Sequence, residues 1–192
     1  MAKEDTRLAI IREGARLIHS KGYNNTGLSD ILRSAGIPKG SFYFYFKSKD
    51  DFGLAVIDYY WAFIEGMAKS YLEGSGTPLE RFERFIDAYE NIFEKMNLSC
   101  GCPIGNLMQE MSDLSEDFRK KVGSVYSRMK DAIGKCLEEA KDKGEVPAGL
   151  DPAEAAQFIL NSWEGAIMHM KLAKSIEPLK VFKRMVFERI LK

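Results

Sequence analysis

The chain has 192 residues, enough for one large domain or two small ones, and its apolar content of 45% is ordinary for a globular protein. The N-terminus is charged from its start, and no apolar run approaches the roughly 18 residues of a membrane span, so we expect neither a signal peptide nor a membrane partner. Formal net charge is zero, but residues 1–50 hold 9 of the 28 Lys/Arg and only 5 of the 28 Asp/Glu. A basic end on an acidic remainder indicates a nucleic-acid partner. An odd number of cysteines, three, makes no disulfide framework and favours a cytoplasmic location.

Two short helices are predicted near the N-terminus. Apolar residues recur at helical spacing over residues 8–18, and Gly22 can end that helix in the left-handed conformation. Thr26 can cap a second helix, which carries apolar residues within 28–32 and stops at Gly36.

The aromatic run 42–46 is ambiguous by itself. Its propensity favours a strand, but a lone strand could not satisfy its backbone and the sequence shows no partner strand. Pro38 is also well placed at a first helical position. Residues 6–50 therefore predict three short helices, with a helix-turn-helix at about 27–46 whose last helix enters the major groove of DNA.

The rest of the chain predicts six further helices. Ser48 with Asp51 resembles a capping box, and Asp151-Pro152 combines a cap with proline at the first helical position. We therefore expect an all-α protein of about nine helices. The six are expected at 48 to the Gly/Pro break of 74–78, 78–96, a short span after 103, 115–143, 152–174 and 178–191.

The N-terminal segment resembles the TetR/AcrR family of transcriptional regulators. The likeness covers about the first 60 residues and includes the turn, the recognition helix and the start of the next helix. It is carried by Gly22-Tyr23, Thr26, Ile31, Ala35-Gly36-Ile37, the run Lys39 to Phe46 and the run Lys47 to Asp50.

This resemblance implies a repressor that binds a palindromic operator as a homodimer and is released by a small molecule. The DNA-binding domain would occupy residues 1–50, and a ligand-binding and dimerisation domain would occupy 51–192. The last two long helices, at about 152–174 and 178–191, would form a four-helix bundle with the partner subunit. Their apolar faces could equally pack within one subunit.

Four residues of the third helix are predicted to contact DNA. Lys39 can reach a phosphate or a guanine edge, and Gly40 removes a side chain where backbone and DNA approach closely. Ser41 and Tyr43 offer hydroxyls to phosphate oxygens. The alternative is an ordinary charged surface, which the ordered family likeness disfavours.

Five further residues complete the predicted DNA contacts. Thr26 and Ser29 open the second helix, whose N-terminus favours a phosphate. Arg33 can reach a base edge or the backbone, and Lys49 is placed for a phosphate. Phe44 stands where the family often has a polar residue, so it contacts a thymine methyl or packs internally. Phe42, Tyr45 and Phe46 are expected in the core.

The inducer would be a small hydrophobic or electrophilic molecule held among the middle helices. Aromatic and Met side chains at helical spacing are its candidate walls, although the same pattern is typical of ordinary core. They are Tyr60, Trp61, Tyr89, Phe93, Met108, Met111, Trp163 and His169.

The loop around Cys102 resembles that of the electrophile-sensing, N-ethylmaleimide-responsive branch of the family. A thiol in a Gly- and Pro-containing loop before a helix N-terminus can be reactive, because a nearby positive dipole favours the thiolate. Cys102 is therefore a candidate sensor, Cys100 a resolving partner, and Cys136 a packing residue. The alternatives are a loop thiol without a role and a purely non-covalent inducer.

Two rival functions have little support in the sequence. Hydrolase, phosphate-loop and metalloprotease motifs are absent from it, so we expect no enzyme and no cofactor. Cys100 and Cys102 offer two thiolates to a metal, but a closed site usually needs four ligands, and only Cys136 and His169 could add to them. We expect no metal site.

Overall fold

The computed structural model describes residues 3–192, which form nine α-helices, one 3-10 turn and one π-helical turn, with no strand in that range. Residues 1 and 2, the start of the charged N-terminal stretch, lie outside the described part. The chain divides into two compact units. The first runs to Phe63 and includes Pro103–Ser124; the second contains Ile64–Cys102 and Val125–Lys192.

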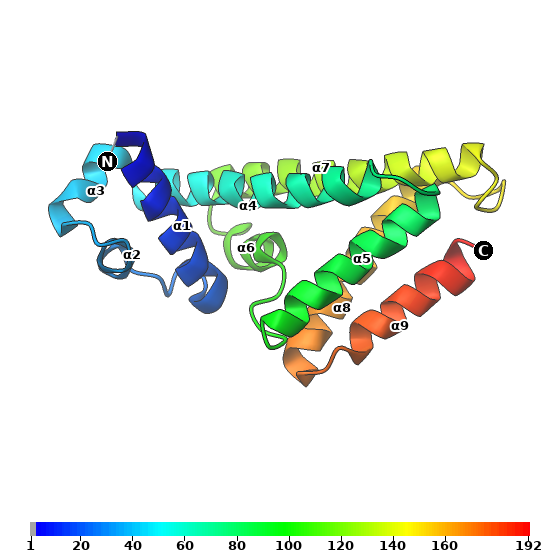
Figure 1. Cartoon of the computed structure of the whole chain (residues 1–192). Coiled ribbons are helices and arrows are strands. Elements are labelled where there is room, and N and C mark those ends of the chain that lie inside the picture. Colours follow the sequence, from blue (N-terminus) through cyan, green and yellow to red (C-terminus); the bar gives the residue numbers. More distant parts are fainter. Residues whose placement is uncertain (1–2) are drawn as a thin grey trace. The chain divides into compact units, whose positions relative to one another are not determined.

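The first unit begins with the predicted helix-turn-helix (Figure 1). Helix α1 spans Lys3–Lys21 and α2 spans Leu28–Ser34. A 3-10 turn, Lys39–Ser41, leads into the short helix α3, Phe42–Tyr45. Helix α4, Lys49–Leu72, contributes its first turns to this unit.

Two more helices complete the first unit. Helix α6 spans Pro103–Met111, and α7 spans Glu116–Asp142, of which the first turns belong here. The small core is aromatic: Phe42, Phe46 and Phe52 are about 1% exposed or less, and their ring centroids lie 5.1–5.9 Å apart. These three rings hold α3 against α4.

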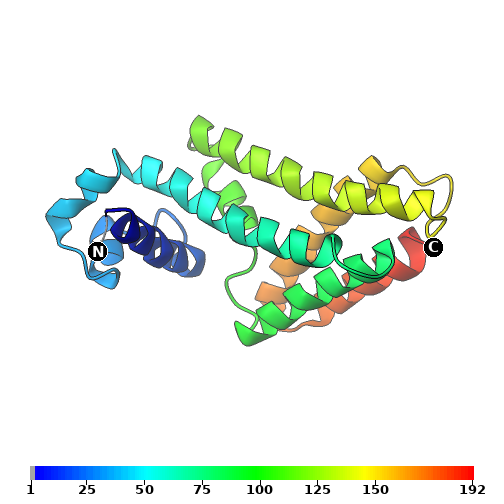
Figure 2. The same cartoon turned by 45° about the horizontal axis from the view of Figure 1, so that its top comes forward.

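The second unit contains α5, Pro78–Lys95, α8, Pro152–Ala173, and α9, Glu177–Met185, with the later turns of α4 and α7. Helix α9 packs on α8 and contacts α5 (Figures 1 and 2), and it continues into a π-helical turn, Val186–Ile190.

Local sequence signals set several of these helix starts. The Asp151 carboxylate accepts hydrogen bonds from the backbone N–H groups of Ala153 and Glu154 at 2.8 and 3.1 Å, with proline at the first position. Thr77 and Glu80 form a reciprocal capping box for α5. In residues 3–192, no helix combines the length and apolarity needed to cross a membrane.

The all-α prediction is confirmed, with two local corrections. The third helix does not begin at Pro38; that residue precedes a 3-10 turn, and the α-helix proper has only four residues. Thr26 does not cap α2, because the N-cap is Gly27 and no side chain bonds there. The predicted boundary at residue 50 falls in the first turn of α4, and the compact units are divided differently, so it stays a prediction.

Candidate DNA interface and sensor site

The 3-10 turn and α3 present an exposed surface. Tyr43 and Phe44 are 71% and 63% exposed, which is unusual for large apolar rings, and Lys39 and Gly40 are exposed beside them. Ser41 is half-buried. The exposed aromatic rings are therefore available to a partner such as DNA.

On α2, two predicted contacts share one face. Ser29 and Arg33 are both exposed and lie one helical turn apart. The Arg33 guanidinium forms an ion pair with Asp30 on the same helix. Because that pair is exposed, it holds Arg33 only weakly, and a phosphate can compete for the guanidinium.

Thr26 and Lys49 make contacts within the headpiece, which is formed by α1, α2, α3 and the first turn of α4. Thr26 is 1% exposed and its hydroxyl donates to the Gly22 carbonyl at 2.7 Å, so in this conformation its side chain does not face a phosphate. The Lys49 ammonium donates to the Tyr23 carbonyl at 2.8 Å and lies 4.5 Å from the centre of the Tyr23 ring. Burial lowers the pKa of Lys49.

Tyr23, in the turn between α1 and α2, contacts three further helices of the first unit. Its hydroxyl donates to Asp50 at 2.6 Å, and its ring packs 4.9 Å from the ring of Phe118 on α7. Burial and the adjacent Asp50 raise its pKa, so the phenol stays neutral. The Glu110 carboxylate on α6 accepts the backbone N–H groups of Tyr23 and Asn24 at 2.8 and 2.7 Å.

Sequence reasoning missed Glu110, because a single Glu on a short helix carries no pattern that distinguishes it from a solvated one. The one sequence signal related to this contact is Gly22, which lies against the Glu110 carboxylate. Its φ is +87°, and a Cβ there would lie 3.0 Å from a Glu110 carboxylate oxygen. Gly22 is therefore required both for the left-handed turn and for the approach of Glu110.

The predicted ligand walls are divided between the two units. Tyr60, Trp61, Met108 and Met111 belong to the first. Tyr60 contacts α1 of the headpiece, because its hydroxyl donates a hydrogen bond to the Ala15 carbonyl at 2.6 Å.

In the second unit, three predicted walls come together. The Trp163 ring lies 6.1 Å from Tyr89 and 6.2 Å from Phe93, and Phe182 of α9, which we did not predict, lies 5.1 Å from it. His169 does not join them: it is exposed. Residues 163, 167 and 170 carry the buried face of α8, and 169 lies off that face. The expectation that His169 is a core histidine is therefore wrong, and its place in a ligand site stays a prediction.

Cys102 lies beside a buried carboxyl group. It is 8% exposed, and its thiol donates a hydrogen bond to Glu164 of α8, which is 7% exposed. Burial raises the pKa of Glu164, and this hydrogen bond lowers it. Cys136 is also buried; its thiol lies 3.3 Å from the Pro78 carbonyl, and burial raises its pKa to about 11. Cys136 therefore packs, as expected.

Several residues of the loop before Cys102 have positive φ angles, in the left-handed region of backbone conformation. Asn97, Leu98 and Cys100 have φ between 52° and 65°, and Gly101 has φ of 77°. Non-glycine residues pay roughly 1–2 kcal/mol each for this conformation. The Lys174 ammonium at the end of α8 donates to the Leu98 carbonyl at 3.3 Å, which helps to hold the loop.

The last two helices carry an exposed apolar face. Its members on α8 are Phe158, Met168 and Leu172, which are 55%, 51% and 83% exposed, and on α9 they are Val181 and Met185. Leu172 in particular is more exposed than any other large apolar side chain described.

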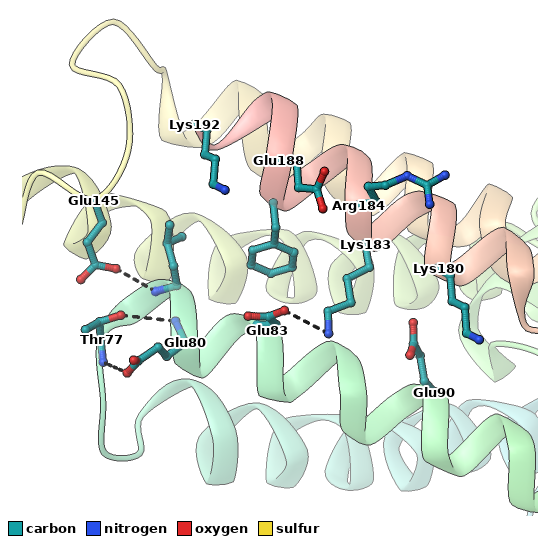
Figure 3. A pocket seen from close by; sticks show the side chains of 12 residues that line it. Thr77, Glu80, Glu83, Glu90, Glu145, Lys180, Lys183, Arg184, Glu188 and Lys192 are labelled. Atoms are coloured by element: carbon teal, nitrogen blue, oxygen red, sulfur yellow. Dashed lines mark hydrogen bonds and ion pairs between the residues drawn. The ribbon is translucent and has the colours of Figure 1, made fainter.

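A separate groove of about 820 Å³ lies between α5 and α9 (Figure 3). Its walls are charged, and Lys183 pairs across it with Glu83 at 3.1 Å and with Asp87 at 2.6 Å. None of the predicted wall residues lines it. Within the described part of the chain, no three His, Cys, Asp or Glu side chains are grouped as metal ligands.

A helix-turn-helix with an exposed recognition helix, joined to a larger helical domain, defines a DNA-binding regulator. The family comparison agrees. Residues 10–56 match the model of bacterial regulatory proteins of the tetR family, and residues 78–186 match the tetracyclin repressor-like C-terminal domain. The chain therefore belongs to the TetR family of transcriptional regulators.

Curated relatives span nearly the whole chain. The transcriptional regulator AcuR of Cereibacter sphaeroides is 37% identical over 92% of this chain and 81% of its own. The repressor DhaR of Mycobacterium sp. strain GP1 is 32% identical over 100% and 95%, and the repressor NemR of Escherichia coli is 30% identical over 93% and 90%.

Solved structures agree in fold. A regulatory protein TetR from Rhodobacter sphaeroides has a TM-score of 0.89 at 36% identity, covering 94% of this chain and 96% of its own. The reduced form of E. coli NemR has a TM-score of 0.85 at 29% identity, covering 96% and 97%. The predicted family and fold class are confirmed.

Proposed function

We propose that the protein represses transcription by binding a palindromic operator as a homodimer, and that a small molecule acting on its second unit releases it. The observation that carries the DNA-binding role is the exposure of two adjacent aromatic rings, Tyr43 and Phe44, beside Lys39, since contiguous exposed rings of this kind are typical of an interaction surface. DhaR and NemR are themselves repressors, which supports repression rather than activation by this protein. We propose no enzymatic activity.

The exposed apolar face of α8 and α9 supports the proposed dimer. A two-fold dimer buries the same patch on both subunits, so one self-complementary apolar face is sufficient. In that dimer His169 would also approach the interface, because it is exposed on α8 next to Met168. Paired headpieces could then read two half-sites about one helical turn apart.

The proposed inducer is a small electrophile that reacts at Cys102. The likeness to NemR and the position of Cys102, directly before α6, support this. Glu110 of α6 bonds the α1–α2 turn, so displacement of α6 would disturb the headpiece. A non-covalent hydrophobic inducer beside Trp163 is the alternative, supported by its aromatic neighbours.

Selection from random double-stranded DNA tests the proposal. The wild-type protein should enrich an inverted repeat, and N-ethylmaleimide should release the protein from it. Enrichment of no repeat would contradict the operator role. If N-ethylmaleimide releases wild type and Cys102→Ser from the operator equally, Cys102 is not the sensor, and the non-covalent inducer is favoured.

A further inference from the structure

The Cys102–Glu164 pair has a feature that packing does not require. The two side chains are buried together, with the thiol donating to the carboxylate. The second carboxylate oxygen, Glu164 Oε1, is buried and has no hydrogen-bond partner in the described structure. Leaving such an oxygen unpaired costs free energy, so a well-packed amide or apolar residue would serve stability better.

Two neutral phenols interact electrostatically with this carboxyl. Burial is the main cause that raises the pKa of Tyr89 on α5 and of Tyr126 on α7, to about 12 for Tyr126, and the charge of Glu164 raises both further. Both phenols therefore stay protonated near neutral pH. In the part of the chain that the structure describes, no ion pair involves Glu164, so no cation weakens it as a base.

We propose that Glu164 is the proton acceptor for Cys102 when the thiol adds to an electrophile with an activated carbon–carbon double bond. This inference rests on the covalent form of the proposed function. The sulfur forms a bond to the β-carbon of the double bond, and the π electron pair moves onto the activating carbonyl group as an enolate. The thiol proton passes to Glu164 and then, through solvent, to the α-carbon. The net reaction is addition of S–H across the double bond, and it needs no oxidant.

The burial of Glu164 suits this role. Burial raises its pKa, which brings the carboxylate closer in basicity to a thiol and makes proton transfer more favourable. A free thiolate beside a carboxylate would place two negative charges in a buried site. Transfer of the proton during bond formation avoids that state, because one proton is shared by the pair throughout.

The test is the pH dependence of Cys102 alkylation by N-ethylmaleimide in the full-length protein, followed by peptide mass spectrometry so that Cys100 and Cys136 are scored separately. In wild type the rate should rise as Glu164 ionises and then level off. In Glu164→Gln the rate at pH 7 should fall about 100-fold, the lower end of general-base contributions. It should then rise only in the alkaline range, as for a free thiol.

Glu90→Gln is the matched control, because Glu90 is a carboxyl on α5 that also has a buried, unpaired oxygen and a pKa raised by burial. It should keep the wild-type profile. An unchanged or faster profile in Glu164→Gln would overturn the proposal. If that variant does not fold, Glu164→Asp replaces it and should keep the acid-side rise at a lower rate; loss of the rise would overturn the proposal.

Operator binding is measured separately on fully alkylated protein. Retained binding with a wild-type alkylation profile would refute release through Cys102 while leaving the role of Glu164 intact. Lost operator binding with an alkylation profile that is independent of Glu164 would refute the role of Glu164 while leaving release through Cys102 intact.

Discussion

At the residue scale, the exposed side chains of the recognition segment make the first prediction. Lys39→Ala and Tyr43→Ala should each weaken operator binding by about 1–3 kcal/mol, because each removes a polar group placed for DNA. Lys135→Ala is the control, since Lys135 is exposed on α7 far along the chain from the headpiece. Fluorescence anisotropy with the selected operator measures the loss. Equal affinity of all three variants would place the recognition surface elsewhere.

Glu110 makes the second prediction. Glu110→Ala removes the acceptor of two backbone N–H groups, so amide hydrogen exchange at Tyr23 and Asn24 should accelerate and the headpiece should be destabilised by about 1–2 kcal/mol. Glu116→Ala, which removes an exposed Glu that pairs only within its own helix, should leave those two amides unchanged. Protected amides in both variants would mean that the α6 bond is dispensable.

Some residue roles could not be read from the sequence. The recognition segment was predictable because its aromatic and charged residues stand in a fixed order. Thr26 was assigned to DNA, yet it is buried, since its hydroxyl bonds a carbonyl four residues earlier in the chain. Glu164 and Glu110 were missed because their partners are 62 and 86–87 residues distant in sequence, and no local pattern reports such contacts.

At the scale of the elements, the helices were predictable where proline and caps mark their starts. For the third helix the five-residue aromatic run alone fits helix and strand equally. The structure shows helical spacing, because Phe42 and Phe46, four residues apart, are buried against Phe52 of α4 while Phe44 between them is exposed. His169 shows the limit of periodicity. A histidine between two methionines is expected to be buried, but Met168 is exposed and Met170 is the one of the two that faces the core.

The exposed face of α8 and α9 makes the third prediction. Leu172→Glu and Phe158→Glu should dissociate the dimer, because each would bury an unpaired charge in the proposed interface. Leu114→Glu is the matched control: Leu114 is 68% exposed but lies between α6 and α7. Sedimentation velocity over a range of concentrations reads the outcome. A dimer that survives both α8 substitutions would assign its interface to other helices.

At the scale of the whole molecule, a neutral chain with a basic N-terminal end makes the fourth prediction. Operator binding should weaken steeply with salt although formal net charge is zero. If the dimer contacts six phosphates, affinity should fall about 1,000-fold between 50 and 200 mM salt. Anisotropy titrations at four salt concentrations measure the slope. A flat response would mean that the basic residues do not reach the phosphates.

The bond between Glu110 and the α1–α2 turn has a consequence for how such regulators diversify. On the headpiece side its partners are backbone N–H groups, which nearly every residue type supplies, and only Gly22 is fixed by the close approach. The residues that we propose read the operator, such as Lys39 and Tyr43, take no part in it. Substitutions that retarget the protein to a new operator therefore leave its link to α6 intact, and target choice and signal response can evolve separately.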